Sequence, residues 1–220
     1  MIRLVVGLGN PGKEYERTRH NAGFWLVERF AQANGVVLRK DPKFKALVGK
    51  HAETWLLLPQ AFMNLSGQPV QMLAGFFKIK PEEVLVVHDE LDFPPGTARL
   101  KQGGGIAGHN GLKDISQRLA SHDYWRLRLG VGKPPAGTEG ADYVLQKPPA
   151  EERTAIDGAI DKAIALMPQI IAGDMQAAMN KLHTEEPHDP EPVKQPEVKK
   201  EAAEDPAAKP GLLKSLFGRK

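Results

Sequence analysis

Hydrophobic positions along this chain follow two different spacings. Short apolar runs bounded by Gly, Pro, Asn or Asp predict buried strands, and longer stretches with an apolar residue every three or four positions predict helices. The predicted strands are 2–8, 36–38, 44–48, 54–58, 84–87, 97–101 and 125–131, and the predicted helices are 21–34, 68–77, 112–119, 150–171 and 173–182. Because strands alternate with helices, the pattern predicts a single three-layer α/β/α domain.

The connections refine this picture. Asp-Pro and Gly-Lys breaks divide the strands between 36 and 58 into hairpin-like pairs, which predicts a mixed twisted sheet and not an all-parallel one. Pro168 lies inside the predicted helix 150–171, and we expect it to kink or end that helix. Residues 132–149 are rich in Gly and Pro and show little periodicity, which predicts a long loop suited to act as a lid.

The periodic pattern stops at residue 184. Residues 184–220 are dominated by Pro, Glu, Lys and Ala, a composition that predicts disorder, so we expect the folded domain to span residues 1–183. The last ten residues, 211–220, differ because four apolar side chains could share one helical face beside basic residues. That pattern fits weak docking to an anionic surface or a partner groove. Ten residues form a marginal isolated helix, so disorder in solution is expected there as well.

Charge and composition narrow the function classes. The tail holds seven Lys or Arg and eight Asp or Glu, so with +3 for the whole chain residues 1–183 carry +4. A mildly basic domain permits a nucleic-acid partner without requiring one. The absence of cysteine excludes disulfides and thiolate metal sites. No run reaches the length of a membrane span, and the first apolar run is too short for a signal peptide, so we expect a cytoplasmic protein.

A glycine-rich turn follows the first predicted strand. Gly7, Gly9 and Gly12 spell G-x-G-x-x-G, the dinucleotide-binding fingerprint, which needs a helix to open at the last glycine. Here Pro11 favours a turn, and helical periodicity begins only near residue 21. We therefore expect no nicotinamide or flavin cofactor, and expect the strand end to present polar side chains to a cleft.

Polar residues gather in the connections near other strand ends as well. Segments 10–20, 88–92 and 103–110 lie at or near the carboxyl ends of predicted strands, where α/β sheets bind ligands. They make His20, Asp89 and the asparagines Asn10, Asn64 and Asn110 candidates for one cleft. A His with a carboxylate partner is a minimal general base. Without a nucleophilic Ser elbow or a Cys, an activated water is the simplest nucleophile, and asparagines can hold an amide or an oxyanion.

Each of these features also has a purely structural interpretation. Asn10 could serve only its Pro-Gly turn, Asn110 could cap helix 112–119, and Asp89 could brace a loop. The residues around Asp89 suggest a metal site, but their spacing matches no known ligand set. The glycines at 103–105 are either merely flexible or allow close approach to a phosphate. The cations near that loop, Lys101, Lys113, Arg126 and Arg128, fit a solvated face or a phosphate site.

Four blocks taken together carry a resemblance. The segments VVGLGNPGKEYERTRHNAG, FMNLSG, HDELDFPPG and GGGIAGHNGLKDI, in this order and spacing, closely resemble the bacterial peptidyl-tRNA hydrolase family over about residues 1–183. The resemblance implies a monomeric α/β enzyme that hydrolyses the ester between a peptide and the 3′ end of tRNA. It also implies that no metal or other cofactor is needed. Ile106 and Ala107 depart from the family pattern, as does the tail.

The resemblance further assigns roles to individual residues. It implies that His20 is the catalytic base, that Asp89 keeps His20 in its basic form, and that Asn10 distinguishes blocked from free aminoacyl-tRNA. The residues implied to bind substrate are Tyr15, Phe62, Asn64, His109 and Asn110, and those implied to grip tRNA phosphate are Lys101 and Arg128.

Two other function classes stay open at this point. A non-catalytic RNA-binding relative of the same fold is the main alternative, although such a protein would not need the His20, Asp89 and Asn10 set. A nucleotide-dependent enzyme is the third class, and it requires a helix that begins at Gly12.

Overall fold

The computed structural model describes residues 1–183, and the expectations for residues 184–220 lie outside the described residues. One seven-stranded sheet has the order β2-β3-β4-β1-β5-β7-β6. Strands β1 (Leu4–Gly7), β4 (Thr54–Pro59), β5 (Val84–Glu90) and β7 (Trp125–Gly130) are parallel to one another. Strands β2 (Arg39–Asp41) and β3 (Ala46–His51) pair antiparallel at one side of this core, and β6 (Ala98–Gln102) pairs antiparallel at the other. The predicted mixed sheet is confirmed.

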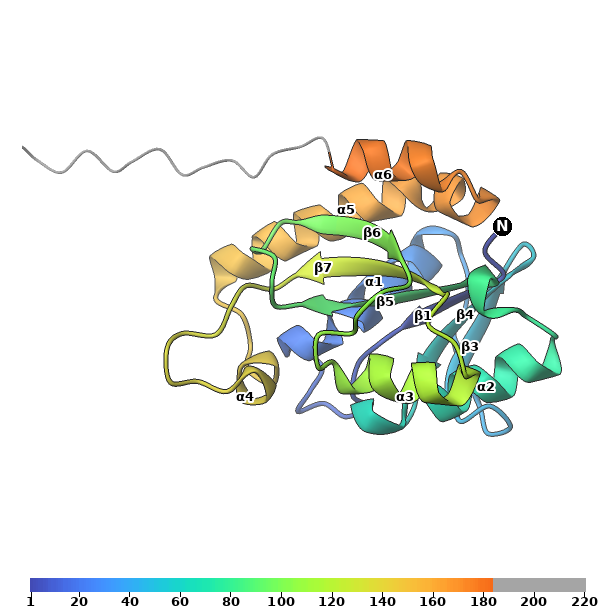
Figure 1. Cartoon of the computed structure of the whole chain (residues 1–220), viewed down its shortest axis with the longest axis horizontal. Coiled ribbons are helices and arrows are strands. Elements are labelled where there is room, and N and C mark those ends of the chain that lie inside the picture. The colour runs from blue at the N-terminus through green and yellow to red at the C-terminus, as the bar shows by residue number, and fades with distance from the viewer. Residues whose placement is uncertain (184–220) are drawn as a thin grey trace, which may run out of the picture. The chain divides into compact units, whose positions relative to one another are not determined.

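Helices cover both faces of the sheet (Figure 1). Helices α1 (Ala22–Ala33), α5 (Ala150–Ala172) and α6 (Met175–His183) lie on one face, and α2 (Gly67–Phe76) and α3 (Asn110–Leu119) lie on the other. Alternation along β1 explains both layers, because Val5 is buried in the cluster under α1 and α5 while Leu4 and Val6 are buried in the cluster under α2 and α3. The predicted three-layer domain is confirmed. None of the helices in residues 1–183 has the length and apolar character to cross a membrane.

The turn after β1 contains no helix at Gly12. Residues 12–18 form turns flanked by two bends, the 3₁₀ turn η1 spans Arg19–Asn21, and α1 begins at Ala22. Gly23 explains the close packing that follows, because a Cβ atom there would lie 2.3 Å from the Val87 carbonyl oxygen and 2.4 Å from the Leu8 nitrogen. Helix α1 thus begins in backbone contact with the ends of β1 and β5, and this contact brings η1 against β5. The dinucleotide interpretation is therefore excluded by the local fold.

The prediction of a strand at 36–38 is wrong, and so is the expected break at Gly49. The strand β2 begins only at Arg39, and β3 runs through Gly49 to His51. A Cβ atom on Gly49 would lie 2.7 Å from a methyl group of Val36 and 3.1 Å from one of Leu38. Residues 36–38 therefore pack over β3 where the glycine leaves room, and they do not join the sheet.

Further boundaries differ from the sequence-based expectations. Strand β5 was expected to end at Val87, but it continues to Glu90 because its last three residues pair with β7. The expected loop 132–149 contains the short helix α4 (Gly140–Val144). Helix α5 continues through Pro168 and ends before Gly173, whose φ of 93° suits a helix C-terminus. The remaining short elements are the 3₁₀ turns η2 (Met63–Leu65) and η3 (Pro81–Glu83).

Candidate active site

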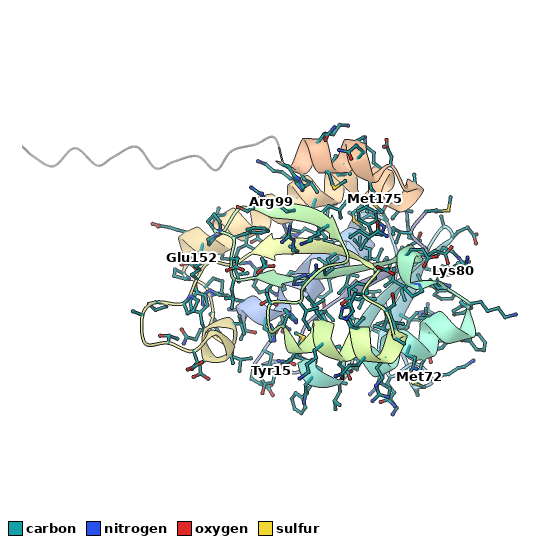
Figure 2. All side chains as sticks on the ribbon, viewed as in Figure 1. Tyr15, Met72, Lys80, Arg99, Glu152 and Met175 are labelled. Carbon is teal, nitrogen blue, oxygen red and sulfur yellow. The ribbon has the colours of Figure 1, made fainter. Side chains whose placement is uncertain are left out.

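A cavity of about 560 Å³ opens beyond the carboxyl ends of β1 and β5. This is the edge at which parallel α/β sheets bind ligands. Eight residues singled out from the sequence line it, namely Asn10, Tyr15, His20, Phe62, Asn64, Asp89, His109 and Asn110. Tyr15 is labelled in Figure 2, and its ring meets that of Phe62 edge to face at 6.3 Å. The separate segments of the sequence thus converge on one pocket.

The buried carboxylate of Asp89 lies at the centre of the polar groups. Its Oδ1 is 2.9 Å from Nδ1 of His20 and 3.2 Å from Nε2 of His109. An ionised carboxylate only accepts hydrogen bonds, so His20 carries its proton on Nδ1. The lone pair of His20 Nε2 is then left free in a side chain that is 12% exposed and lines the cavity. This is the geometry of a general base with an orienting carboxylate.

His109 is the N-cap of α3, a role that the sequence suggested for Asn110. Its Nδ1 accepts a hydrogen bond from the Leu112 backbone N–H at 3.4 Å. The Nε2 atom must therefore carry the proton that is donated to Asp89. Asn110 is the first residue of the helix, and its exposed side chain lines the cavity instead. The capping interpretation of Asn110 is wrong, because His109 occupies that position.

The pKa values of His20 and Asp89 are set by their burial and by the charged groups that they contact. Burial lowers the pKa of His20, but the charge of Asp89 and the hydrogen bond to it outweigh burial and raise that pKa above 6.5. Burial raises the pKa of Asp89, but the charges of His20 and His109 and their hydrogen bonds hold it well below its usual value. Asp89 is therefore ionised at neutral pH and favours the imidazolium that forms when His20 accepts a proton.

His88 also lines the cavity but is not suited to proton transfer. Its Nδ1 donates to the Asp89 backbone carbonyl at 2.6 Å, and its buried Nε2 has no hydrogen-bond partner. Burial, with a contribution from His109, lowers the pKa of His88 to about 3. His88 is therefore neutral at physiological pH. Of the histidines that line the cavity, His20 combines a free Nε2 lone pair with a raised pKa, whereas the low pKa of His88 makes it a weak base.

A metal interpretation was tested against the same contacts. Within residues 1–183, His20, Asp89 and His109 form the cluster whose ligand atoms lie close enough to hold an ion, all within 4.8 Å. Both imidazoles, however, donate N–H groups to Asp89, and a metal on His109 Nε2 would require its proton to move to Nδ1. That move would remove the cap of α3. The contacts fit a hydrogen-bonded pair better than a metal site.

Asn10 makes contacts far beyond its own turn. Its Oδ1 accepts from the Met63 backbone N–H at 2.7 Å, which leaves its Nδ2 group as a donor at the cavity. Asn21 holds the Asn10 backbone from both sides, accepting from its N–H and donating to its carbonyl, each at 2.9 Å. The interpretation of Asn10 as turn chemistry alone is wrong. Sequence reasoning missed Asn21 and Met63, although both stand inside the quoted motif blocks.

The glycine-rich loop is held by a buried arginine. Arg126 donates from Nη1 to the Gly105 carbonyl at 2.8 Å and from Nη2 to the Gly103 carbonyl. Arg126 is 3% exposed, so the solvated-face interpretation is wrong for this residue. The loop ends in a tight turn at Ala107 (φ 46°) and Gly108 (φ 74°), closed by the His109 N–H on the Ile106 carbonyl at 2.9 Å. An alanine with this φ costs about 1 kcal/mol, and the strained residue stands two positions before His109.

Lys101 and Arg128 lie outside the cavity, on the neighbouring strands β6 and β7. The register pairs Arg99 with Arg128 and Lys101 with Arg126, while the intervening Leu100 and Leu127 are buried under α5 and α6. The four cations therefore share the opposite face of the sheet, beside the glycine-rich loop. Arg128 lies 4.6 Å from the centre of the Phe93 ring and 3.9 Å from Glu90. Arg126 is already bound to the loop carbonyls, so the exposed Arg99 and Lys101 and the partly buried Arg128 are the cations that suit an anionic ligand.

Comparisons with known proteins agree with this site. The family model described as Peptidyl-tRNA hydrolase matches residues 4–190. A peptidyl-tRNA hydrolase of Thiobacillus denitrificans is 55% identical over 182 residues, covering 83% of this chain and 90% of the relative. One of Cupriavidus metallidurans is 52% identical over 196 residues, covering 84% and 99%. The crystal structure of peptidyl-tRNA hydrolase from Acinetobacter baumannii is similar with a TM-score of 0.80 and 45% identity, covering 83% of this chain and 95% of that one.

Proposed function

The chain belongs to the peptidyl-tRNA hydrolase family and hydrolyses peptidyl-tRNA, and we propose that it does so with water activated by the His20–Asp89 pair. The observation that carries this mechanism is the free Nε2 of His20 at the cavity, with Nδ1 held by a buried, ionised carboxylate. Among the described residues that line the cavity there is no Ser, Thr, Cys or Lys, so the lining offers no aliphatic hydroxyl, thiol or amine as a covalent nucleophile.

The reaction proceeds in two proton transfers. His20 Nε2 removes a proton from water as the water oxygen attacks the ester carbonyl, and Asp89 stabilises the resulting imidazolium. The imidazolium then returns the proton to the 3′ oxygen of the terminal ribose as the ester C–O bond breaks. The products are the peptide acid and a tRNA with a free 3′ hydroxyl. Every group in this scheme comes from one copy of the chain, which supports the proposal of a monomer; we also propose that the chain needs no cofactor and works in the cytoplasm.

The asparagines around His20 supply recognition of the acyl group. Because Asn10 Oδ1 is occupied by Met63, only its Nδ2 donor is available to a ligand. An N-blocked aminoacyl group offers a carbonyl acceptor at that point, whereas a free aminoacyl group offers an ammonium that cannot accept a hydrogen bond. Asn64 and Asn110 stand at the same cavity with exposed amides, and Tyr15 and Phe62 add an aromatic wall.

This proposal predicts a sharp difference between two substrates. N-acetylated aminoacyl-tRNA should be hydrolysed, and the same tRNA carrying the free amino acid should be spared, with release of labelled amino acid as the readout. Replacing Asn10 with Ala should reduce the difference in hydrolysis rate between the two substrates, because the Nδ2 donor that selects the blocked group is lost. Cleavage of neither ester, with RNA binding retained, would instead support the non-catalytic RNA-binding alternative.

The cations on β6 and β7 support a second part of the proposal, in which Lys101 and Arg128 contact tRNA phosphate. Replacing Lys101 with Ala should weaken tRNA binding and reduce the slope of log affinity against log salt by about 1, since one phosphate contact is lost. Lys40 on β2, at the other edge of the sheet, offers a matched control. If the affinity of Lys101→Ala for tRNA depends on salt as steeply as that of the wild type, Lys101 does not contact a phosphate.

A further inference from the structure

Helix α4 forms one wall of the cavity. Gly140 and Ala141 from its first turn, and Val144 and Leu145 at its end, line the cavity together with the asparagines. A helix of five residues inside an otherwise irregular segment does not hold its own position. The position of this wall therefore depends on side chains from elsewhere in the chain.

Arg19 provides the main attachment. Its Nη1 lies 3.5 Å, 3.3 Å and 3.4 Å from the carbonyl oxygens of Tyr143, Gln146 and Lys147, which close the C-terminal end of α4. The backbone N–H of Arg19 donates to the same Gln146 carbonyl at 3.1 Å. Only 4% of the Arg19 side chain is exposed. A buried cation thus meets three carbonyl oxygens at and just beyond the C-terminal end of α4, where positive charge is favoured.

The same guanidinium is fixed from two further directions. Its Nη2 donates to Glu152 Oε2 at 2.8 Å, and Figure 2 labels Glu152 in the first turn of α5. The Tyr143 ring lies 4.0 Å from the guanidinium carbon, and the Tyr143 hydroxyl donates to the Val131 carbonyl at 3.2 Å. Helix α4 is therefore attached to η1, to α5 and to the end of β7 through one arginine and one tyrosine.

Arg19 immediately precedes His20 in η1. We propose that Arg19 is a positioning residue that fixes α4 as the wall of the substrate pocket beside His20. Its role rests on the proposed function and concerns substrate binding, because no Arg19 atom reaches the hydrogen bonds of the His20–Asp89 pair. Contacts that are equal in the ground state and the transition state change KM and leave kcat unchanged. Lysine cannot replace this arginine, since it lacks the planar fork that meets several carbonyls, a carboxylate and a ring together.

Two variants and a matched control test this role in the full-length chain. Arg19→Lys removes the planar guanidinium. Glu152→Gln keeps Arg19 but removes the charge of its carboxylate partner, and this second variant still tests the role if Arg19→Lys fails to fold. Arg153→Lys is the control, because Arg153 also stacks on an aromatic ring (Trp25, 3.6 Å) and pairs with a carboxylate (Asp157, 3.0 Å), but its hydrogen bonds go to Asp157 and Pro149 and not to α4. With N-acetylated aminoacyl-tRNA, KM should rise about tenfold in Arg19→Lys and about threefold in Glu152→Gln, with kcat within about twofold.

Limited chymotrypsin cleavage gives an independent readout. Tyr143 lies in α4 and Leu145 at its end, so cleavage after these residues should be faster in both variants and unchanged in the control. An inactive wild-type chain would overturn the proposed function, and the cleavage rates would still test the attachment of α4. An active wild type with unchanged KM in both variants would overturn the role of Arg19. A fall in kcat at constant KM would also overturn it, since Arg19 would then act on His20 and not on the wall.

Discussion

Replacement of His20 with Ala is expected to lower kcat on N-acetylated aminoacyl-tRNA by about 10²–10⁴-fold, the range that a positioned general base contributes. His20 supplies the lone pair at the cavity that is free to accept a proton from water, since Nδ1 is held by Asp89 and His88 is buried and neutral. Affinity for deacylated tRNA should stay within about twofold, because phosphate binding is expected from other residues.

A second variant separates lost chemistry from lost structure. Asn at position 20 can still donate an N–H to Asp89, so His20→Asn should keep the buried carboxylate partnered and lose turnover to the same extent. His122→Ala, at an exposed histidine outside the cavity, is the control and should behave as wild type. Near-normal turnover in His20→Asn, measured by single-turnover hydrolysis, would rule out the imidazole as the base.

Replacement of Asp89 with Asn should lower kcat by about 10²-fold at neutral pH, as expected for a base whose imidazolium loses its counter-charge. Both histidines donate to the same atom, Oδ1, and the amide oxygen of Asn can accept both hydrogen bonds. The substitution therefore removes the charge while preserving the contacts. Asp92→Asn is a suitable control, because Asp92 is exposed at the cavity rim and makes no hydrogen bond or ion pair to His20 or His109 within the described residues. An equal fall in kcat in Asp89→Asn and Asp92→Asn would argue against a specific role for Asp89.

The parts of the fold that depend on local pattern were predictable. Alternation of apolar runs and helical stripes indicated the three layers, and Pro11 and Gly12 favoured a turn over a nucleotide-binding helix, as the structure confirms. The errors arose where a distant contact decides the local structure. Val36 and Leu38 look like strand residues, yet they pack over Gly49, and β5 is longer than its apolar run because β7 pairs with its polar end.

The candidate site shows the same division. Polar residues at strand ends are visible in a sequence, and they indicated five residues that line the cavity, namely Asn10, His20, Asn64, Asp89 and Asn110. The family resemblance added Tyr15, Phe62 and His109. The hydrogen-bond partner of each side chain, however, cannot be predicted from the sequence. That His109 and not Asn110 caps α3, and that Asn10 Oδ1 is taken by Met63, depend on which backbone N–H groups come within reach after folding. Arg19 stood beside His20 in the first block, but its contacts with residues 143–152 are set only by the tertiary structure.

The pH dependence of kcat/KM tests the His20–Asp89 pair most directly. A histidine that serves as the base accepts a proton only in its neutral form, and Asp89 raises the pKa of His20 above 6.5. If His20 is the base, wild-type activity should be full above that pKa and should fall as pH drops through it. Asp89→Asn removes the charge that raises the pKa, so the acid limb of its residual activity should move to lower pH. An acid limb with the same midpoint in both proteins would contradict the proposal that Asp89 tunes His20 as the catalytic base.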